Sequence, residues 1–450
     1  MPASSPSAFH ALEKQALRAA AWSIVEFGSS MGLRVVSSLV LTRLLLPAYF
    51  GEVALVMTLI VGIALLSDIG LAPSVVQSPR GDDPVFLNTA WTIQCIRGMI
   101  LWVLAIAISW PMSVFYRDPK LRHLVPVVAF CTFISGFNST NLLSLNRHLQ
   151  VRRLFAIDVS AAVVSLIVTL IWAHYWPSVW AIVAGQVSLS LYRLLLSHIP
   201  SITPGIRNSF CLDRSSMHGI IHFGKWIMIG TAFYFFASQS DRLILGKLVG
   251  LTLLGIYGIA YQISDIPRAI ISALGNRVLY PFTSKMIYLP RDEFRQRFLR
   301  YRFFILLSAC SLLSVMVIWG NLLVLKLYDH RYHEAAWMIP IFALGLWHTI
   351  LCQTTFPVLL SLGKSKYSAM ANAPYCLAIV IGVPLAFHFF GMKGAVIAVA
   401  AGDFPFYVVN QIGVTRAGIR PFRQDLQMTA VFISMLLALF FINRMFLSFF

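Results

Sequence analysis

Thirteen runs of about twenty or more mostly apolar residues follow one another along the chain, with short polar breaks between them. An α-helix needs about 20 such residues to cross the hydrocarbon core of a bilayer, where each backbone polar group must find a partner inside the protein. The pattern therefore predicts an all-α polytopic membrane protein. The predicted spans are residues 21–45, 50–77, 88–116, 121–145, 154–175, 177–198, 218–240, 250–281, 301–328, 335–361, 367–390, 393–415 and 427–449.

The scarcity of ionic residues agrees with lipid as the solvent. Of the 450 residues, 58% are hydrophobic and only 12% are charged, whereas about a quarter of the residues are charged in an ordinary soluble domain. The formal net charge is +18, but the basic residues lie in short connections, and no basic face interleaved with aromatic residues is present. We therefore exclude a soluble enzyme and expect no nucleic-acid partner.

The basic residues also predict the orientation in the membrane. With the N-terminus in the cytoplasm, twenty Lys and Arg residues fall in inside connections and ten in outside connections, as expected from the excess of basic residues in cytoplasmic loops. The clusters Arg147/Arg152/Arg153 and Arg291–Arg302 contribute most to this difference. The first twenty residues are typical of an amphipathic segment at the membrane surface.

A polar connection between the sixth and seventh spans predicts two halves. Residues 22–51 align with residues 226–255 at a constant shift of 204 positions, which indicates an internal repeat, with chance similarity as the alternative. Because a six-helix unit begins and ends on the same side of the membrane, the two halves would form a parallel repeat. We expect an N-terminal segment, a first six-helix half, a cytoplasmic loop, a second six-helix half and one additional C-terminal helix, at residues 1–20, 21–200, 201–216, 217–415 and 416–450. The sequence leaves open whether the spans number 12, 13 or 14.

Charged residues inside the predicted spans are candidate functional residues. A charge in hydrocarbon is costly, so such residues normally face a bundle interior or a water-filled cavity. Five of them are basic and five acidic, and they are Arg34, Arg97, Lys225, Arg268, Arg277, Glu26, Asp68, Asp158, Asp265 and Asp403.

Asp265 and Arg268 are three residues apart, so one helical face carries both side chains. Two interpretations stay open. The first is an internal ion pair. In the second, Arg268 turns toward a central cavity and holds an anionic head group in a bidentate fork, while Asp265 restrains it or couples it to protons.

Two further groups of these charges have open interpretations. Arg34 with Arg97 or Asp68 forms either a second cationic site or a structural bridge between helices. Asp403 lies between a glycine and a nearby proline, where either a helix break exposes carbonyl groups to a cation or the carboxyl is simply buried and hydrogen-bonded.

No catalytic motif is present in the sequence. It contains no Walker loop, GxSxG or HExxH, and the six cysteines are scattered without a CxxC pair. Its longest connections are too short to build a sizeable polar active site. We therefore predict a transporter that is not an enzyme and holds no cofactor or metal, with coupling to H⁺ or Na⁺ left open.

Two segments carry a resemblance to a known family. Residues 241–267 read DRLILGKLVGLTLLGIYGIAYQISDIP, and the first half has the matching form LTRLLLPAYFGEVALV, followed from residue 68 by DIGL. These segments resemble the Wzx-like oligosaccharide flippases, which are polysaccharide biosynthesis transporters of the multidrug/oligosaccharidyl-lipid/polysaccharide (MOP) superfamily. The resemblance implies a MATE-like fold and alternating-access flipping of undecaprenyl-pyrophosphate-linked oligosaccharide repeat units, for exopolysaccharide, capsule or O-antigen of lipopolysaccharide.

By the same resemblance, spans one, two, seven and eight line a cationic substrate cavity. Position and charge then give the candidate substrate-binding residues Arg34, Arg268, Arg277, Lys225 and Arg97, and the candidate ion-coupling residues Glu26, Asp68, Asp265 and Asp403.

The resemblance also sets expectations for location and partners. We expect a multi-pass monomer in the bacterial inner membrane, in contact with the lipid-linked oligosaccharide, membrane lipids, a polysaccharide polymerase and a chain-length regulator. Two alternatives stay open, a MATE-like drug or cation antiporter and a non-transporting membrane scaffold of a polysaccharide assembly complex.

Overall fold

The computed structural model describes residues 28–448 except 69, 149, 275–289 and 363–365. Within these ranges all regular elements are helical. The chain divides into two compact units, Met1–Phe235 and Phe236–Phe450, and the division lies inside helix α9 (Arg214–Leu248). We call these units the N-lobe and the C-lobe and describe each by itself.

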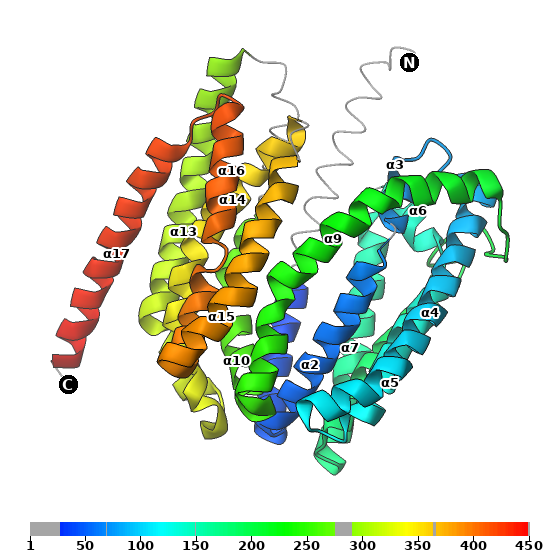
Figure 1. Ribbon diagram of the computed structural model, residues 1–450, viewed down its shortest axis with the longest axis horizontal. Helices are drawn as coiled ribbons and strands as arrows, with labels where there is room; N and C mark the ends of the chain where they lie inside the picture. The colour runs from blue at the N-terminus through cyan, green and yellow to red at the C-terminus, as the bar shows by residue number, and fades with distance from the viewer. Residues whose placement is uncertain (1–27, 69, 149, 275–289, 363–365, 449–450) are drawn as a thin grey trace. The chain divides into compact units, whose positions relative to one another are not determined.

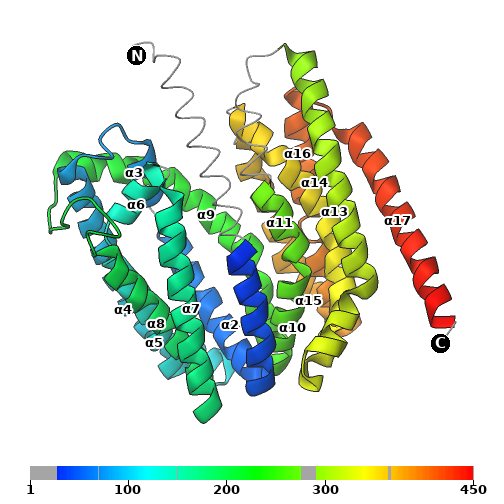
Figure 2. The same ribbon diagram turned by 180° about the vertical axis from the view of Figure 1, so that it is seen from behind.

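The N-lobe begins with a helix over residues 28–44, and its later helices pack in pairs. Helix α5 packs against α4, α8 and α2, and α7 packs against α8 (Figures 1 and 2). The helices before α9 are α2 (Pro47–Leu66), α3 (Leu71–Gln77), α4 (Pro84–Tyr116), α5 (Leu121–Gly136), α6 (Asn141–Arg147), α7 (Val151–Tyr175) and α8 (Val179–Ser197).

Two glycines allow the close contact between α4 and α5. A Cβ atom on Gly98 would lie 3.1 Å from the carbonyl oxygen of Thr132 and 3.2 Å from the Cα of Gly136. Small residues at such crossings let two backbones approach, which is how helices associate where no water drives them together. The α4–α5 pair forms one wall of the cavity described below.

Helices α5 and α6 follow one another with a bend of 67° between them, and together they are long and apolar enough for a span. The bend frees carbonyl groups at the end of α5, and a lipid-facing protein must satisfy them internally. The side-chain amide of Gln94 on α4 donates to the carbonyls of Ser135, Gly136 and Asn138, at 3.2, 3.1 and 3.2 Å. The indole of Trp91 donates to the next carbonyl, at residue 137. Side chains of α4 therefore stabilise the bend.

The C-lobe contains the end of α9 and seven further α-helices within the described residues (Figure 1). They are α10 (Gly250–Ser264), α11 (Ile266–Leu274), α13 (Arg291–Leu327), α14 (Met338–Ser361), α15 (Lys366–Ala401), α16 (Phe404–Arg416) and α17 (Phe422–Ser448), with a short 3-10 helix η2 (His330–Ala335) before α14.

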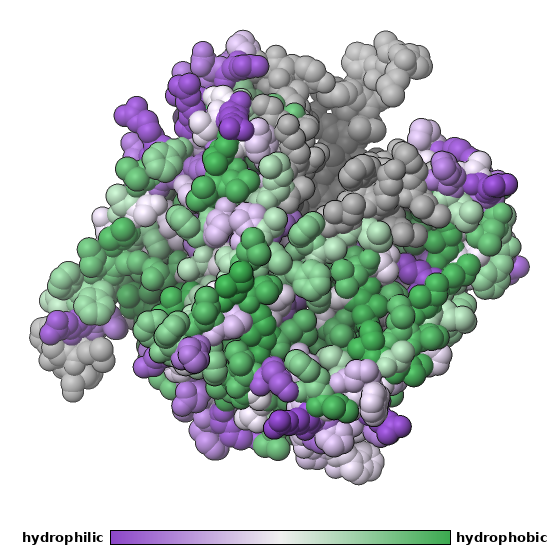
Figure 3. Space-filling model, viewed as in Figure 1, coloured by the Kyte–Doolittle hydropathy of each residue, from purple (hydrophilic) through white to green (hydrophobic). Residues whose placement is uncertain are grey.

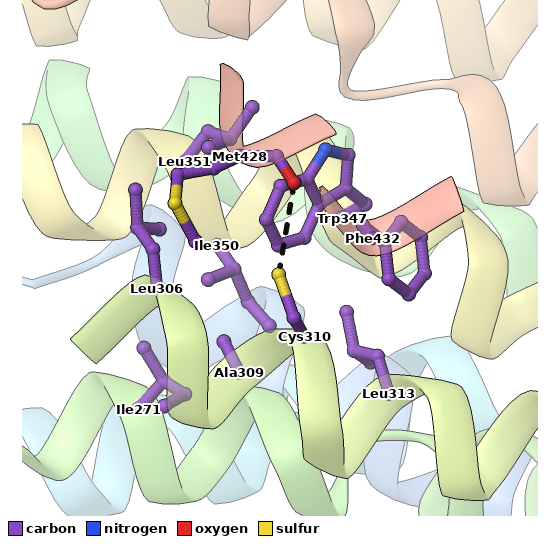
Figure 4. Packing of buried hydrophobic residues seen from close by; sticks show 10 residues of the cluster. All are labelled: Ile271, Leu306, Ala309, Cys310, Leu313, Trp347, Ile350, Leu351, Met428 and Phe432. Carbon is purple, nitrogen blue, oxygen red and sulfur yellow. Dashed lines mark hydrogen bonds between the residues drawn. The ribbon is translucent and has the colours of Figure 1, made fainter. Parts of the chain in front are cut away.

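The core of the C-lobe lies where α13, α14 and α17 meet (Figure 4). The rings of Trp347 and Phe432 stack with their centroids 4.8 Å apart. The thiol of Cys310 on α13 points to the backbone carbonyl of Met428 on α17, at 3.7 Å. This packing holds the last helix against the lobe.

Eight helices of the described residues are long and apolar enough to cross a membrane, or nine if the bent α5–α6 pair counts as one span. The sequence predicted thirteen. The predicted span 250–281 is broken into α10 and α11. The apolar stretch Met370–Arg416 counts once among the eight, although the backbone at Gly391 is non-helical (φ 59°, ψ −148°), between the predicted spans 367–390 and 393–415. The span predicted at 21–45 lies partly outside the described residues, and the one at 218–240 is part of α9.

In each lobe, hydrophobic residues cover the middle of the visible face, and hydrophilic residues gather toward the ends (Figure 3). Large apolar side chains are widely exposed in both lobes, including Trp176 at 69% in the N-lobe and Phe390 at 75% in the C-lobe. So large an exposed apolar surface is unfavourable in water, but it is favourable in contact with lipid acyl chains. The protein is therefore a multi-pass membrane protein.

One basic residue lies where the sequence did not predict it. We expected Arg302 in a cytoplasmic connection, as part of the cluster Arg291–Arg302. Instead, α13 begins at Arg291, so Arg302 lies three turns inside this helix and is fully buried. The long polar start of α13 is the reason, because it extends the helix well before the apolar run begins.

Candidate functional site

A cavity of about 520 Å³ lies inside the N-lobe. Its walls come from α2, α3, α4, α5, α6 and α8. Apolar side chains such as Leu101 and Val128 form part of the lining. Its polar lining consists of Asp68, Gln94, Arg97, Thr132, Ser135, Asn138, Ser139, Gln186 and Arg193, together with the thiol of Cys131.

Arg97 reaches this cavity from α4 and caps the end of α2. Its Nη2 donates to the carbonyl of Ala64 at 2.6 Å, and its Nε donates to the hydroxyl of Ser67 at 3.3 Å. The last carbonyls of a helix have no partner within the helix and carry partial negative charge, so a guanidinium is favourable there. Arg97 is half-buried. It is thus held in place by the backbone of α2.

Asp68 follows directly after α2 and lines the same cavity. Its Oδ1 accepts a hydrogen bond of 2.9 Å from the backbone N–H of Gly70. Gly70 has a φ of 62°, which is the left-handed region that glycine adopts without strain. The turn between α2 and α3 therefore fixes Asp68 at the cavity wall. The sequence grouped Arg34 with Arg97 or Asp68, and the structure brings Asp68 and Arg97, but not Arg34, to the lining of one cavity.

Arg193 is a cavity residue that sequence reasoning missed. We counted it among the basic residues of the connections, although the predicted span 177–198 includes it. It lies within α8 and pairs with Asp158 of α7, with Nη2 and Oδ1 3.2 Å apart. Gln186, two turns earlier on the same face of α8, lines the cavity as well. A lysine or arginine near a span end gives no sequence signal for whether it points inward, so only the packing of α7 on α8 identifies this pair.

Asp265 and Arg268 contact each other in the C-lobe. The guanidinium of Arg268 forms a two-pronged contact with the carboxylate, with 2.7 Å between Nη2 and Oδ2. Asp265 is the residue between α10 and α11, so the pair lies at the break in the predicted eighth span. Both side chains are partly exposed, at 30% for Arg268 and 21% for Asp265. The ion pair that we considered is present, and the role of Arg268 in binding substrate stays a prediction.

Asp403 lies at the break between α15 and α16 and is hydrogen-bonded from α14. Its Oδ1 contacts Nε2 of His348, and its Oδ2 accepts a hydrogen bond from the hydroxyl of Thr349. Of our two interpretations of Asp403, the structure shows the hydrogen-bonded carboxyl. His348 was missed, because 55 residues separate it from its partner in the sequence.

Four predicted site residues remain, and they are Arg34, Lys225, Glu26 and Arg277. Arg34 is exposed on the helix at 28–44. Lys225 lies in α9, but its side chain falls outside the described part of the structure. Glu26 and Arg277 lie outside the described residues. No group of three or more His, Cys, Asp or Glu side chains that could hold a metal occurs among the residues that the structure describes.

Helices α3 and α6 lie side by side in the N-lobe (Figure 1), and ion pairs link α6 to the loop between α3 and α4. Asp82 pairs with Arg147 at 3.0 Å and with His148 at 2.9 Å. Close by, hydrogen bonds from Ser215 and Ser216 hold the pKa of Asp213 well below its usual range. The contacts of Asp82 link the loop before α4 to α6. The carboxyl of Asp213 caps the start of α9.

The chain is similar to known proteins of polysaccharide biosynthesis. A family model described as "Polysaccharide biosynthesis protein" matches residues 40–337. The lipopolysaccharide biosynthesis protein WzxC of Escherichia coli (strain K12) is 22% identical over 413 residues, which cover 89% of this chain and 80% of that protein. The succinoglycan biosynthesis transport protein ExoT of Rhizobium meliloti (strain 1021) is 22% identical over 277 residues, covering 61% of this chain and 55% of that protein.

Solved structures are similar over most of the chain. The lipid II flippase MurJ in an inward closed conformation gives a TM-score of 0.72 at 10% identity, covering 93% of each chain. An inward-facing multidrug resistance transporter of the MATE family, in the MOP superfamily, gives a TM-score of 0.67 at 14% identity, covering 86% of this chain and 94% of that one. At these identities the likeness shows the fold alone.

Proposed function

Because this chain belongs to the polysaccharide biosynthesis protein family, we propose that it flips undecaprenyl-pyrophosphate-linked oligosaccharide repeat units from the inner to the outer leaflet of the bacterial inner membrane. The observation that carries the proposal is the family match over residues 40–337. Two relatives support it by their names, one as a biosynthesis transport protein and one as a lipid II flippase. The cargo would serve assembly of an exopolysaccharide, a capsule or O-antigen.

In this proposal the two six-helix halves at 21–200 and 217–415 form a parallel repeat that transports its cargo by alternating access. The N-terminus is cytoplasmic, and the protein acts as a monomer beside a polymerase and a chain-length regulator. Cationic side chains bind the pyrophosphate, because a guanidinium stays charged and matches phosphate oxygens in a fork. The proposed contacts are Arg34, Arg268, Arg277, Lys225 and Arg97.

For Arg268 the proposal requires an exchange of partners. In the described structure its fork is occupied by Asp265, through two hydrogen bonds. A pyrophosphate also offers two acceptor oxygens to the guanidinium fork and carries more negative charge, so it can displace the carboxylate. Release of Asp265 would then leave a free carboxylate that takes up a cation or proton. Cargo binding and ion coupling would thus both take place at the break between α10 and α11.

We further propose that coupling to an H⁺ or Na⁺ gradient uses carboxylates that line these helices. Asp68 and Asp403 are suited to it, since each lies at a break between two helices, where a local charge change can alter the angle of the break. The imidazole of His348 contacts the Asp403 carboxylate, so a change of charge on Asp403 would act directly on that contact. Glu26 and Asp265 complete the set of candidates.

The MATE fold keeps a drug or cation antiporter as the second candidate function. An antiporter for organic cations would need an excess of acidic groups around its cargo. The described N-lobe cavity instead has two arginines and one aspartate in its lining. This lining lacks the acidic excess that an antiporter for organic cations would need, which favours the flippase.

The experiment is a deletion of the gene in its bacterial host. We expect undecaprenyl-linked repeat units to accumulate on the cytoplasmic side and surface polysaccharide to disappear, with both restored by the native gene. Arg268→Ala should fail to restore them, while Arg297→Ala should succeed, because Arg297 is an exposed residue that pairs with Glu293 one turn away on α13. Normal surface polysaccharide in the deletion strain would reject the proposal.

A further inference from the structure

The N-lobe cavity contains buried polar atoms that lack a partner within the described part of the chain. They are Nε of Arg193 and Oδ1 of Asn138, one donor and one acceptor. A buried polar atom without a hydrogen bond costs about 1–3 kcal/mol, so native proteins rarely leave one unpaired without a reason. Both residues line the cavity, and a ligand that carries acceptors as well as donors would satisfy them.

The charges around the cavity cancel. Arg97 and Arg193 contribute two positive charges, and Asp68 contributes one negative charge within the lining. Asp158, behind the lining, forms an ion pair with Arg193 and supplies the second negative charge. A site with no net charge and several planar polar groups gives no advantage to an anion or a cation. It suits a neutral ligand that is rich in hydroxyl groups.

The size and the apolar part of the lining agree with such a ligand. A volume of about 520 Å³ falls in the range of about 300–1,000 Å³ that small-molecule sites occupy. Met57, Leu101 and Val128 give the cavity an apolar side, against which the C–H face of a sugar ring can pack. The carboxamide of Gln186 adds a donor and an acceptor for vicinal hydroxyls.

We propose that this cavity is a subsite for one neutral sugar unit of the glycan, inside the N-lobe. A sugar hydroxyl donates to Oδ1 of Asn138, and a second hydroxyl accepts from Nε of Arg193. The inference rests on the proposed function, in that the cargo is a glycan. Beyond that function, it specifies that the N-lobe binds a neutral sugar of the cargo. It also identifies Asn138, Gln186 and Arg193 as residues that determine specificity.

Cys131 provides the readout, because its thiol lies in the cavity lining. The full-length protein would keep Cys131 and carry alanine at its other five cysteines. The rate at which methyl methanethiosulfonate modifies the thiol is then measured at rising concentrations of D-glucose, D-glucuronate and the acyclic polyol mannitol. We expect glucose to slow the reaction at lower concentration than glucuronate or mannitol does.

Two variants on α8 make the test more specific. Gln186→Ala should raise the glucose concentration for half protection by up to about tenfold, which corresponds to about 1.4 kcal/mol for lost hydrogen bonding. Ser188→Ala is the matched control, since Ser188 lies on the same helix outside the lining and donates only to the carbonyl of Gly185. It should leave protection unchanged.

Three results would overturn the inference: no protection by glucose, protection by glucuronate at equal or lower concentration, or equal effects of the two variants. If the thiol does not react, equilibrium dialysis of radiolabelled D-glucose against the same proteins gives the same comparison. The inference fails separately from the proposed function. Binding of a free sugar requires no flipping, and flipping without sugar protection would leave the flippase proposal intact.

Discussion

Nη1 of Arg302 and Oδ1 of Asp425 lie 2.6 Å apart inside the C-lobe, where the side chains are 0% and 3% exposed. The pair joins α13 to α17. Arg302 also donates to the hydroxyl of Thr354 at 2.9 Å and to the carbonyl of Leu351 at 3.2 Å, both on α14. These extra hydrogen bonds offset part of the cost of burying two charges. One guanidinium therefore links three helices of the lobe.

Replacing Asp425 by alanine should destabilise the protein by about 3–5 kcal/mol, because it leaves the buried charge of Arg302 uncompensated. Thermal unfolding of the detergent-purified protein measures this. The exposed pair Arg297–Glu293 on the same helix is the control, and Glu293→Ala should change stability by about 0.5 kcal/mol or less. The combination Arg302→Met with Asp425→Leu should recover most of the loss. Equal effects of the two single variants would contradict this account of the pair.

Gln94→Leu should destabilise the N-lobe by about 1–3 kcal/mol, since three carbonyls at the α5–α6 bend lose their donor. Faster hydrogen exchange at residues 135–141 would locate the effect at the bend. Gln150→Leu, at an exposed position between α6 and α7, is the control. An unchanged bend in the variant would show that the carbonyls have other partners.

Stability should fall at low pH in part through Asp329. Hydrogen bonds from the side chain and backbone of Arg331 lower the pKa of Asp329 to about 2, from about 3.9 in an unfolded chain. The folded pKa is depressed, so the stabilisation is present above about pH 4 and is lost as the pH falls toward 2. Asp329→Asn should lower the unfolding temperature at neutral pH, and its difference from the native protein should shrink over that window. If the difference in unfolding temperature between the two proteins grew as the pH fell, it would contradict a lowered pKa of Asp329 in the folded protein.

Asp403→Asn should reduce transport that is driven by an ion gradient while leaving slow equilibration of cargo between the leaflets. The carboxamide keeps a contact to Thr349 but cannot carry the negative charge that faces His348. His348→Gln tests the other partner in the same assay. If both variants respond to a gradient as the native protein does, these residues do not couple the ion.

Some of this architecture could be predicted from the sequence, and some could not. Apolar runs predicted the membrane helices, and the spacing of Asp265 and Arg268 predicted their contact, because helical periodicity is a local signal. Arg193 and Arg302 were assigned to loops. Hydropathy locates an apolar run but not how far its helix extends into a polar flank.

Pairs that are distant in the sequence carry no such signal. Arg302 and Asp425 are 123 positions apart in the numbering, and His348 and Asp403 are 55 apart. Only the packing of α13 on α17, and of α14 beside the start of α16, brings them together. The N-lobe cavity could not be predicted from the sequence either, because its walls depend on the bend between α5 and α6. Asp68 and Arg97 had been named as candidates, but not as parts of one cavity with Arg193.

The most direct measurement is the exposure of undecaprenyl-pyrophosphate-linked oligosaccharide in proteoliposomes. The sugar lipid begins in the inner leaflet, and a membrane-impermeant sugar oxidant in the outer solution reports how fast it crosses. We predict that the native protein makes the sugar reactive at a rate far above that of protein-free vesicles, and that Arg268→Ala slows this rate while Arg297→Ala does not. A native protein that leaves the sugar as inaccessible as empty vesicles do would contradict the account.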